Sequence, residues 1–458
     1  ADDGIVCISI SDIEIRNLRK ICGEIFGEDN FVADLIWSNK EGGGSSDSKL
    51  FRIKHEHILI FSKVISKVQI KGVPITNEDR YKSSDEFEAI RGKYYLQKLG
   101  MGSIQYSDSL DYPINTPDGG VVFPADNNGG KKACWRWSKE KLKWGIENGF
   151  VEIKKDSNNI WTVYTKQYLN CDNEGNIITR TQRPMGIIDS YSSTQAAKYL
   201  ESIGLGNMFD YTKPYNLITY LVNICSDDGI ILDFFSGSAT TAHAVMQLNA
   251  EDGGNRKFIM VQLPEPCADG TEAAKAKFKN ICEIGKERIR RAGEKIKAEI
   301  EEQNAQLKLG EEPRKVPDIG FKVFKLDSSN LKQWQPDYDD LETTLFDSIS
   351  NYVDGRSELD VVYEIMLKMG MELTWPLETH TIGGKNVYEI GMGALMICLD
   401  DHITTEVAEG MAALYKELAP ETWRVVFKDN GFADDSAKVN IKEILKTAGL
   451  EEDAFTTV

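Results

Sequence analysis

The sequence predicts an α/β protein that is built from several domains. Short apolar runs typical of strands alternate with amphipathic stretches typical of helices in residues 1–68, and the same alternation returns after residue 208. Between these two regions lies a stretch rich in Gly, Asn, Asp and Tyr in which the alternation is lost. A chain of 458 residues has room for two to four domains.

The first 68 residues contain three predicted strands and one helix. Residues 4–10, 31–37 and 57–62 are apolar runs of strand length, and we expect the first of them to be buried. Ser11 and Glu14 have the spacing of a capping box, which predicts that a helix begins there. The sequence EGGGSS at 41–46 predicts a mobile surface loop.

Residues 69–208 form a predicted insert, in which short β-like runs such as WTVYTKQYL alternate with turn sequences such as PDGG and DNNGG. Regular elements resume as a helix at 215–225, strands at 230–235 and 258–263, and helices at 238–248 and 272–300. A charged linker follows, and the last residues form a separate small α/β domain. The predicted domains are 1–68, 69–208, 209–307 and 318–458.

The charge is unevenly distributed along the chain. The net charge is −18, which by itself disfavours a nucleic-acid partner. Residues 321–458, however, contain 12 Lys and Arg against 26 Asp and Glu, a net charge of −14, so the first 320 residues carry only −4. A nearly neutral body of this kind is compatible with a basic groove for DNA.

The eight cysteines and five histidines do not predict a metal site. The chain has no C-x-x-C pair and no zinc-type spacing, so we expect reduced thiols in a cytoplasmic protein. No apolar run is long enough to cross a bilayer. We therefore expect neither a bound metal nor a membrane partner.

One stretch has the pattern of a nucleotide-binding crossover. In IILDFFSGSATTAHA, residues 230–244, an apolar strand ends at Asp233, turns through a Gly/Ser loop and enters a helix of small residues. Glycine lets a ligand approach the backbone, a helix N-terminus favours an anionic group, and Asp233 can accept hydrogen bonds from a ligand ammonium group. Without further context the pattern also fits a plain strand–turn–helix, and His243 is expected to be a packed helix residue.

The same stretch resembles the S-adenosylmethionine motif D-x-F-x-G-S-G-T-T of amino-methylating DNA methyltransferases. Two further segments resemble sequences of that family, namely FDYTKP at 209–214 and KHEHILIFSK at 54–63. The order of these segments, with an insert between the two halves, is most similar to the modification subunit of type III restriction systems. The resemblance covers roughly residues 1–330.

The resemblance implies a Rossmann-like S-adenosylmethionine-dependent methyltransferase fold, with residues 69–208 as a target-recognition domain. It implies that the cofactor is bound by the residues that match the family's motifs, namely Thr212, Lys213, Pro214, Asp233, Phe234, Phe235, Ser236, Gly237, Ser238 and Thr240. The family usually holds the ribose with a carboxylate after the second strand of this half. Here Gln262 occupies the usual place and Glu265 lies just beyond it, and Glu265 is slightly favoured.

The sequence departs from the family pattern in two places. Ala239 replaces the second glycine of the motif, which predicts a negative φ there, because alanine is strained in the left-handed region. The family's catalytic motif [D/N/S]-P-P-[Y/F/W] is missing, since the chain has no Pro-Pro dipeptide. In the family this motif precedes the strand at residues 4–10, so we expect the N-terminal part of the methyltransferase domain to lie outside this chain, and the chain alone to be inactive.

The insert is the part expected to read DNA. The candidate contacts are basic residues. They lie close to aromatic residues in sequence, in a second basic cluster, or beside the Gly/Ser loop: Lys40, Lys131, Lys132, Arg136, Arg180 and Arg183. Trp135 and Trp137 fit equally well as base contacts and as core residues of the insert. In the helix at 272–300, basic residues that include Lys286 and Arg288 are balanced by glutamates, which is typical of a solvated face.

The resemblance implies a site-specific adenine-N6 DNA methyltransferase of a restriction-modification system, which flips its target base out of double-stranded DNA. The expected partners are DNA, a second modification subunit and a restriction subunit. A non-catalytic DNA-recognition or scaffold subunit with a vestigial cofactor fold has the same motifs, and an upstream reading frame that encodes D-P-P-Y would distinguish the two. A methyltransferase that acts on protein or a small molecule leaves the basic and aromatic insert unexplained.

Overall fold

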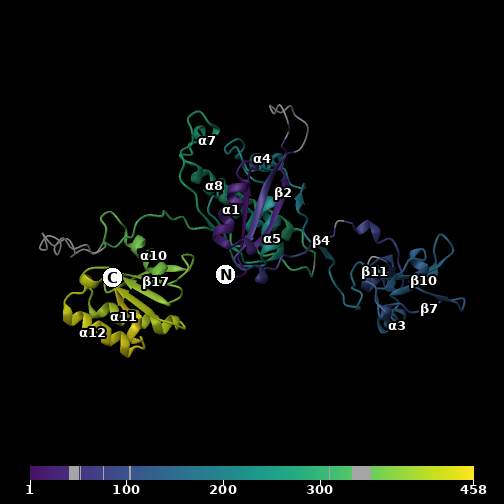
Figure 1. Ribbon diagram of the computed structural model, residues 1–458. Helices are drawn as coiled ribbons and strands as arrows, with labels where there is room; N and C mark the ends of the chain where they lie inside the picture. The colour runs from purple at the N-terminus through teal and green to yellow at the C-terminus, as the bar shows by residue number, and fades with distance from the viewer. Residues whose placement is uncertain (41–50, 52, 76, 103–104, 309, 333–351) are drawn as a thin grey trace. The chain divides into compact units, whose positions relative to one another are not determined.

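The structure is a computed structural model in which residues 1–40, 51, 53–75, 77–102, 105–308, 310–332 and 352–458 are described (Figure 1). The chain divides into two compact units, 1–320 and 321–458. This division lies close to residue 318, where the sequence places the start of the C-terminal domain. The glycine- and serine-rich loop predicted at 41–46 lies outside the described residues.

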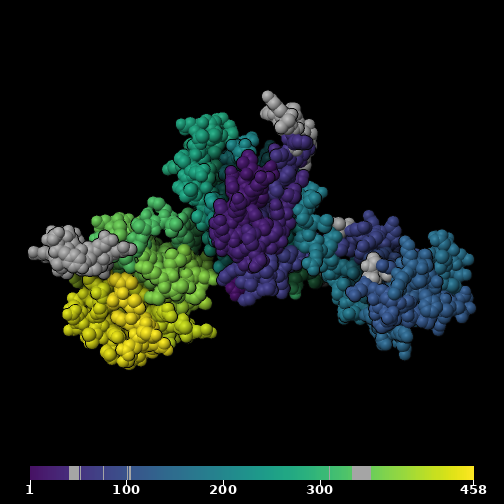
Figure 2. All heavy atoms as spheres, viewed as in Figure 1, coloured from purple at the N-terminus to yellow at the C-terminus, as the bar shows by residue number. Residues whose placement is uncertain are grey.

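The N-terminal segments form one mixed sheet. Its strands β1 (Ile5–Ile10), β2 (Phe31–Ser38), β3 (His55–Ser62) and β13 (Ile187–Ile188) follow the order β1-β3-β2-β13. β3 is antiparallel to both neighbours, and β13 pairs with β2 in parallel. Because side chains alternate along β3, Leu59 packs with α1 (Ile15–Phe26) on one face and Ile58 packs with α5 (Tyr215–Cys225) on the other. In Figure 2 the purple residues that include α1 form the near surface over this sheet.

Two expectations for the N-terminal segment are wrong. β1 is only half-buried, with Ser9 exposed, because among the described residues it is an edge strand of the sheet. α1 begins at Ile15 rather than near Ser11, and Glu14 takes the N-cap position without a side-chain hydrogen bond. The capping box expected at Ser11 and Glu14 therefore does not form.

The insert is held together by its own apolar core. Its main sheet has the order β10-β11-β5, and Trp135, Phe150 and Tyr168 are completely buried. Trp137 is also buried, so both tryptophans are core residues and not base contacts. The elements of the insert are α2 (Glu88–Arg91), β5 (Tyr94–Lys98), β6 (Gly100–Met101), β7 (Ile114–Asn115), β8 (Val121–Val122), β9 (Cys134–Trp135), α3 (Lys139–Glu147), β10 (Val151–Lys155) and β11 (Trp161–Tyr168).

The sequence places the end of the insert at residue 208, but in the structure the insert ends earlier. β4 (Val73–Pro74) pairs with β12 (Thr181–Gln182), where the chain enters and leaves the insert. Beyond this pair, β13 joins the N-terminal sheet. α4 (Ser193–Ser202), which begins with a capping box at Ser192, packs through Leu200 with Phe278. Residues 187–208 are therefore part of the body of this unit.

A parallel pair of strands forms the rest of the first unit. β14 (Ile230–Asp233) pairs with β15 (Lys257–Met260), and α6 (Thr240–Asp252) connects them, as a parallel crossover requires. The helix expected from 272 to 300 is instead two helices, α7 (Glu272–Lys275) and α8 (Ile281–Ala305). They are separated by Lys277, whose φ is 68°, and by Asn280, which caps α8 by accepting a hydrogen bond from Glu283 N.

The C-terminal unit consists, in its described part, of a sheet with helices packed on both faces. The sheet order is β16 (Leu377–Ile382), β17 (Lys385–Ile390), β18 (Leu395–Cys398), β19 (Arg424–Phe427) and β20 (Phe455–Thr457). α11 (Thr405–Leu418) and α12 (Asp435–Thr447) share one core cluster, and α10 (Glu358–Lys368) belongs to the other. Each face of the sheet therefore has its own buried core.

Short 3-10 helices occupy connections in both units: η1 (Glu28–Asn30), η2 (Ile65–Lys67), η3 (Glu78–Arg80), η4 (Asp108–Leu110), η5 (Asp126–Asn128), η6 (Asp429–Gly431) and η7 (Glu452–Ala454). No helix within the described ranges combines the length and the apolar character that a membrane span requires.

Candidate functional site

The loop between β14 and α6, residues 234–239, turns tightly at the end of a strand. Ser236 O accepts a hydrogen bond from Ala239 N at 2.7 Å. Gly237 adopts a φ of 50°, and a Cβ at this position would lie 3.2 Å from Phe209 Cζ. Both the backbone conformation and the close approach of Phe209 therefore favour glycine at this position.

Ala239 lies in the left-handed region, with a φ of 59° and a ψ of 41°. The expectation of a negative φ at this position is wrong. The turn sets the backbone conformation even though the side chain opposes it, and alanine in this region costs roughly 1–2 kcal/mol. The residue is buried, and a Cβ added to Gly285 of α8 would lie 3.4 Å from the Ala239 methyl carbon. The loop and α8 are thus in close contact.

Asp233 organises the start of α6. Thr241 Oγ1 donates a hydrogen bond to Asp233 Oδ2 at 2.6 Å, and Phe235 N donates to Asp233 Oδ1 at 3.2 Å. A carboxylate has about four acceptor positions, so acceptor capacity remains for a ligand. The neighbouring rings of Phe234 and Phe235 are 52% and 82% exposed and offer an apolar surface beside the carboxylate.

Three buried hydroxyl groups surround the guanidinium of Arg288. Arg288 Nη1 donates hydrogen bonds to Ser238 Oγ and Thr240 Oγ1, both at 2.7 Å, and to Thr212 Oγ1 at 2.9 Å. Arg288 is only 1% exposed, and burial lowers its pKa to about 10. Among the described residues no acidic side chain forms an ion pair with it. The hydroxyl cluster therefore connects α8, the loop and the segment before α5.

The expectation that Arg288 lies on a solvated face is wrong. Arg288 is four residues from Ile284 and from Ala292, both buried, so it lies on the apolar side of α8. The side chain of Arg290 is 55% exposed, as expected, whereas that of Lys286, which pairs with Glu283, is only 25% exposed. The four-residue spacing is present in the sequence and would have placed Arg288 in the core.

Lys213 connects the two halves of the first unit through Glu56 of β3. Lys213 Nζ donates to Glu56 Oε2 at 2.8 Å, and Asn39 Nδ2 donates to Glu56 Oε1 at 2.8 Å. Burial alone would raise the pKa of Glu56, but the hydrogen bonds from Lys213 and Asn39 outweigh burial and hold this pKa below its usual value. Pro214 is buried and is the N-cap of α5, so the Lys-Pro segment is fixed at both residues.

Gln262 is bonded to the loop, whereas Glu265 is exposed. Gln262 Oε1 accepts a hydrogen bond from Gly237 N at 2.7 Å, and Gln262 Nε2 donates to Leu263 O at 3.2 Å. The amide of Gln262 thus already has partners within the protein. The side chain of Glu265 is exposed, and Glu265 stays the predicted ribose ligand.

His243 is a packed residue of α6, as expected. It is 1% exposed, and its ring centroid lies 4.5 Å from that of Tyr199 and 4.2 Å from that of Tyr215. Burial and the positive charges of Arg288 and Lys295 lower its pKa well below the usual value. The ring is therefore neutral at physiological pH and stabilises the helix by stacking.

The candidate DNA contacts fall into two groups. Lys40, Lys131, Lys132 and Arg183 have exposed side chains. Arg136 and Arg180 are half-buried, and their guanidinium groups donate hydrogen bonds to Gln97, Lys98 and Thr165 and to the carbonyls of Tyr168 and Cys171. These two arginines therefore also stabilise the insert, and their contact with DNA stays a prediction.

The loop offers groups of opposite character to a ligand. The first hydrogen bond within α6 is donated by His243 N to Ala239 O at 3.4 Å, so the N–H groups at residues 240–242 have no acceptor within the helix. These groups form the positive end of the helix dipole. The Asp233 carboxylate lies beside them, since its Oδ2 accepts a hydrogen bond from Thr241 Oγ1 in the first turn of α6. A ligand with both an anionic and a cationic group matches this arrangement.

Comparison with known proteins shows the family of this chain. A family model described as DNA methylase matches residues 1–303. The chain belongs to the DNA methylase family. The match includes the N-terminal sheet, the insert and the loop after β14, whereas the C-terminal unit lies outside it.

Relatives of this DNA methylase are modification enzymes. The chain is 30% identical to the Mod subunit of the type III restriction-modification enzyme StyLTI of Salmonella typhimurium, over 71% of this chain and 45% of that protein. It is 27% identical to the EcoP15I Mod subunit of Escherichia coli, over 97% of this chain and 68% of that protein. It is 30% identical to the type II methyltransferase M.KpnI of Klebsiella pneumoniae, over 62% of this chain and 68% of that protein. The chain spans about half the length of two of these relatives: 45% of the StyLTI Mod subunit and 46% of the EcoPI Mod subunit of Escherichia phage P1.

Proposed function

We propose that this DNA methylase binds S-adenosylmethionine at the loop between β14 and α6, as part of a site-specific adenine-N6 methyltransferase of a restriction-modification system. The observation that carries the proposal is the position of the Asp233 carboxylate beside the N–H groups of residues 240–242, which have no acceptor within α6, in a loop held by Arg288. S-adenosylmethionine has an ammonium and a carboxylate group, which complement the Asp233 carboxylate and these N–H groups respectively. When bound, it supplies a methyl group on a sulfonium centre.

The residues of the loop fit such a ligand. Gly237 permits the positive φ that the loop requires, and Phe209 packs where a side chain would lie. The exposed rings of Phe234 and Phe235 offer apolar contact for a nucleoside base, and the exposed Glu265 offers a carboxylate for ribose hydroxyls. Thr212 and Ser238 hold the loop through Arg288 and are positioning residues in this proposal.

The insert is the proposed DNA-reading part. Its exposed Lys131 and Lys132, together with Arg183 and Lys40, provide positive charge for phosphate contacts. The methyl-transfer motif known from the family is not among the 458 residues, so no residue of this chain is assigned to the transfer step. Double-stranded DNA, a second modification subunit and a restriction subunit are the proposed partners, and the cytoplasm is the proposed location.

Calorimetric titration with S-adenosylmethionine tests the cofactor proposal. We expect the wild-type chain to bind the cofactor, and Asp233→Asn to weaken binding by about 10- to 100-fold, since a charge-assisted hydrogen bond contributes about 1.5–3 kcal/mol. Asp228→Asn is the matched control, because Asp228 is exposed in the turn before β14. Equal affinities of the wild type and Asp233→Asn would exclude this loop. DNA binding without any cofactor binding would favour the scaffold subunit instead.

A further inference from the structure

Two histidines and an aspartate meet at one end of the antiparallel pair β1 and β3, outside the proposed cofactor loop. His55 and His57 are two residues apart on β3, so both rings lie on the same face of the sheet, with centroids 5.4 Å apart. Asp12 follows β1, whose last residue, Ile10, is paired with His57. One potential ligand atom from each of the three side chains lies within 4.8 Å of the other two.

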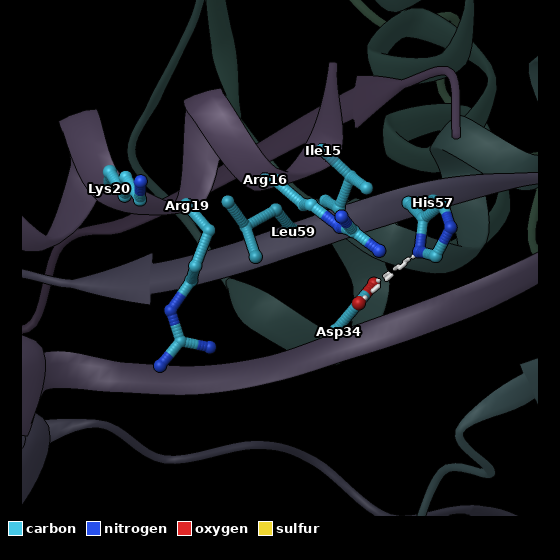
Figure 3. A pocket seen from close by; sticks show the side chains of 7 residues that line it. All are labelled: Ile15, Arg16, Arg19, Lys20, Asp34, His57 and Leu59. Carbon is cyan, nitrogen blue, oxygen red and sulfur yellow. Dashed lines mark hydrogen bonds and ion pairs between the residues drawn. The ribbon is translucent and has the colours of Figure 1, made fainter. Parts of the chain in front are cut away.

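A fourth residue fixes the orientation of the His57 ring. Asp34 of β2 has its carboxylate oxygens 3.0 and 3.2 Å from His57 Nδ1, as the dashed line in Figure 3 shows. A ring that donates from Nδ1 in this way carries its lone pair on Nε2 when it is neutral. His57 Nε2 is shielded from solvent and has no hydrogen-bond partner among the described residues. Asp12 Oδ1 lies 3.5 Å from it.

This arrangement needs a positive charge between His57 and Asp12. A lone pair on Nε2 and the carboxylate of Asp12 are both electron-rich, so their approach is unfavourable without a proton or a metal ion between them. Metal-bound histidines in proteins typically donate their other ring N–H to a carboxylate, which is the relation that Asp34 has to His57. Two imidazoles and a carboxylate form a ligand set for divalent transition metals.

We propose that Asp12, His55 and His57 bind a divalent transition metal of the zinc class, with Asp34 as the residue that orients His57. Ligand atoms on a tetrahedral zinc ion are about 3.3 Å apart, and the 3.5 Å between His57 Nε2 and Asp12 Oδ1 is close to this spacing. The expectation of no metal site rested on cysteine and histidine spacing along the chain. The pairing of β1 with β3 brings Asp12 to the two histidines although it is far from them in sequence.

Three basic side chains near the site line a cavity that Asp12 and His55 do not line. Asp34 and His57 also line this cavity of about 440 Å³, together with Ile15, Arg16, Arg19, Lys20 and Leu59. In Figure 3 the Nδ1 side of the His57 ring faces Asp34, and the Nε2 atom lies on the side of the ring away from the Arg16 guanidinium. Nε2 therefore faces away from this cation, and Asp12 Oδ1 lies 3.5 Å from Nε2. The side chain of Asp12 is 52% exposed, so the ion can enter from solvent.

The test is a zinc titration of the whole 458-residue chain. The protein is stripped with a chelator and titrated with Zn²⁺ in competition with a chromophoric zinc indicator. We expect one tight site, which His57→Ala and Asp12→Asn weaken at least 100-fold and which Asp34→Asn weakens by about 10- to 100-fold, as loss of an orienting partner does. His402→Gln is the control outside the cluster and should bind like the wild type. Circular dichroism of each variant shows whether it has folded.

A second set of side chains, Glu378, His380 and Glu389, is close enough together to bind an ion and provides the competing outcome. Zinc binding that persists in His57→Ala but is lost in His380→Ala would place the ion in the C-terminal unit and overturn the proposal. The proposal is also overturned if the wild type binds no zinc and NMR shows both nitrogens of His57 protonated, because the ring is then an imidazolium between two carboxylates. Loading with Co²⁺ gives an independent readout, since its visible absorption should disappear in His57→Ala.

Discussion

The guanidinium of Arg288 donates a hydrogen bond of 2.7 Å to the hydroxyl of Ser238, and both side chains are buried. A buried arginine without an acidic partner loses its hydration, and hydrogen bonds to hydroxyl groups replace only part of it. The conformation of the loop after β14 therefore depends on a helix that begins about 40 residues later in the chain. This dependence gives the loop a fixed shape before any ligand arrives.

Replacing Arg288 by alanine should destabilise the protein and weaken cofactor binding. The variant loses three hydrogen bonds to hydroxyl groups and the packing of a fully buried side chain, so we expect the free energy of unfolding to fall by about 3 kcal/mol. Urea denaturation measures this change. Arg290→Ala on the same helix removes a side chain that is 55% exposed and should change the free energy of unfolding by less than about 0.5 kcal/mol. Similar losses in both variants would contradict the buried role of Arg288.

Ala239→Gly should stabilise the protein, because glycine adopts the observed φ of 59° without strain. We expect a gain of about 1 kcal/mol in the free energy of unfolding, reduced somewhat by loss of the buried methyl group. Ala242→Gly is the matched control, since Ala242 is equally buried but lies within α6, where glycine costs about 1 kcal/mol. The two substitutions should shift the melting temperature in opposite directions. A decrease in both would show that Ala239 is not strained.

Local patterns predicted much of this fold. The helix at 215–225 was placed at its observed ends, and the loop after Asp233 was placed between its strand and helix, because apolar periodicity and a short Gly/Ser turn are properties of neighbouring residues. The break before α8 also has a local signal, since Asn280 precedes Glu283 with the spacing of a helix cap. The Lys, Arg and Glu residues on both sides of this break are nevertheless typical of one longer helix.

Contacts between distant residues could not be predicted in this way. Asp12 approaches His57 only because β1 and β3 are adjacent, and Lys213 meets Glu56 only because the two halves of the unit pack together. The φ of Ala239 is imposed by closure of the turn, against the preference of the residue itself. These features depend on the tertiary structure, which explains why composition and spacing left them undetermined.

The ion pair of Glu56 and Lys213 should make stability depend on pH. The pKa of Glu56 is lowered in the folded protein, so its stabilisation is present above the pKa of the unfolded chain and is lost as the pH falls through the folded value. We expect Glu56→Gln to lower the free energy of unfolding by about 1–2 kcal/mol at neutral pH. The difference from the wild type should shrink below the usual glutamate pKa and then vanish.

Urea titrations of both proteins at a series of pH values measure this dependence. Glu28→Gln serves as control, because Glu28 is 66% exposed in its pair with Arg19, and exposed pairs contribute less than about 1 kcal/mol. A difference for Glu56→Gln that is the same at every pH would mean that the variant disturbs packing rather than a charge.

The C-terminal unit should bind protein rather than DNA. Its residues 321–458 carry a net charge of −14, which repels phosphate, whereas the first 320 residues carry −4 and contain the exposed lysines of the insert. Each unit has its own buried core, so residues 1–320 can be compared with the whole chain. Fluorescence anisotropy with duplex DNA over a range of salt concentrations should give the same affinity and the same salt slope for residues 1–320 and for the whole chain.

The double substitution Lys131→Gln and Lys132→Gln should reduce the salt slope by about two, because two phosphate contacts are lost. If removal of residues 321–458 abolishes DNA binding while the remaining unit stays folded, the C-terminal unit contacts DNA despite its charge, and its assignment to protein partners is wrong.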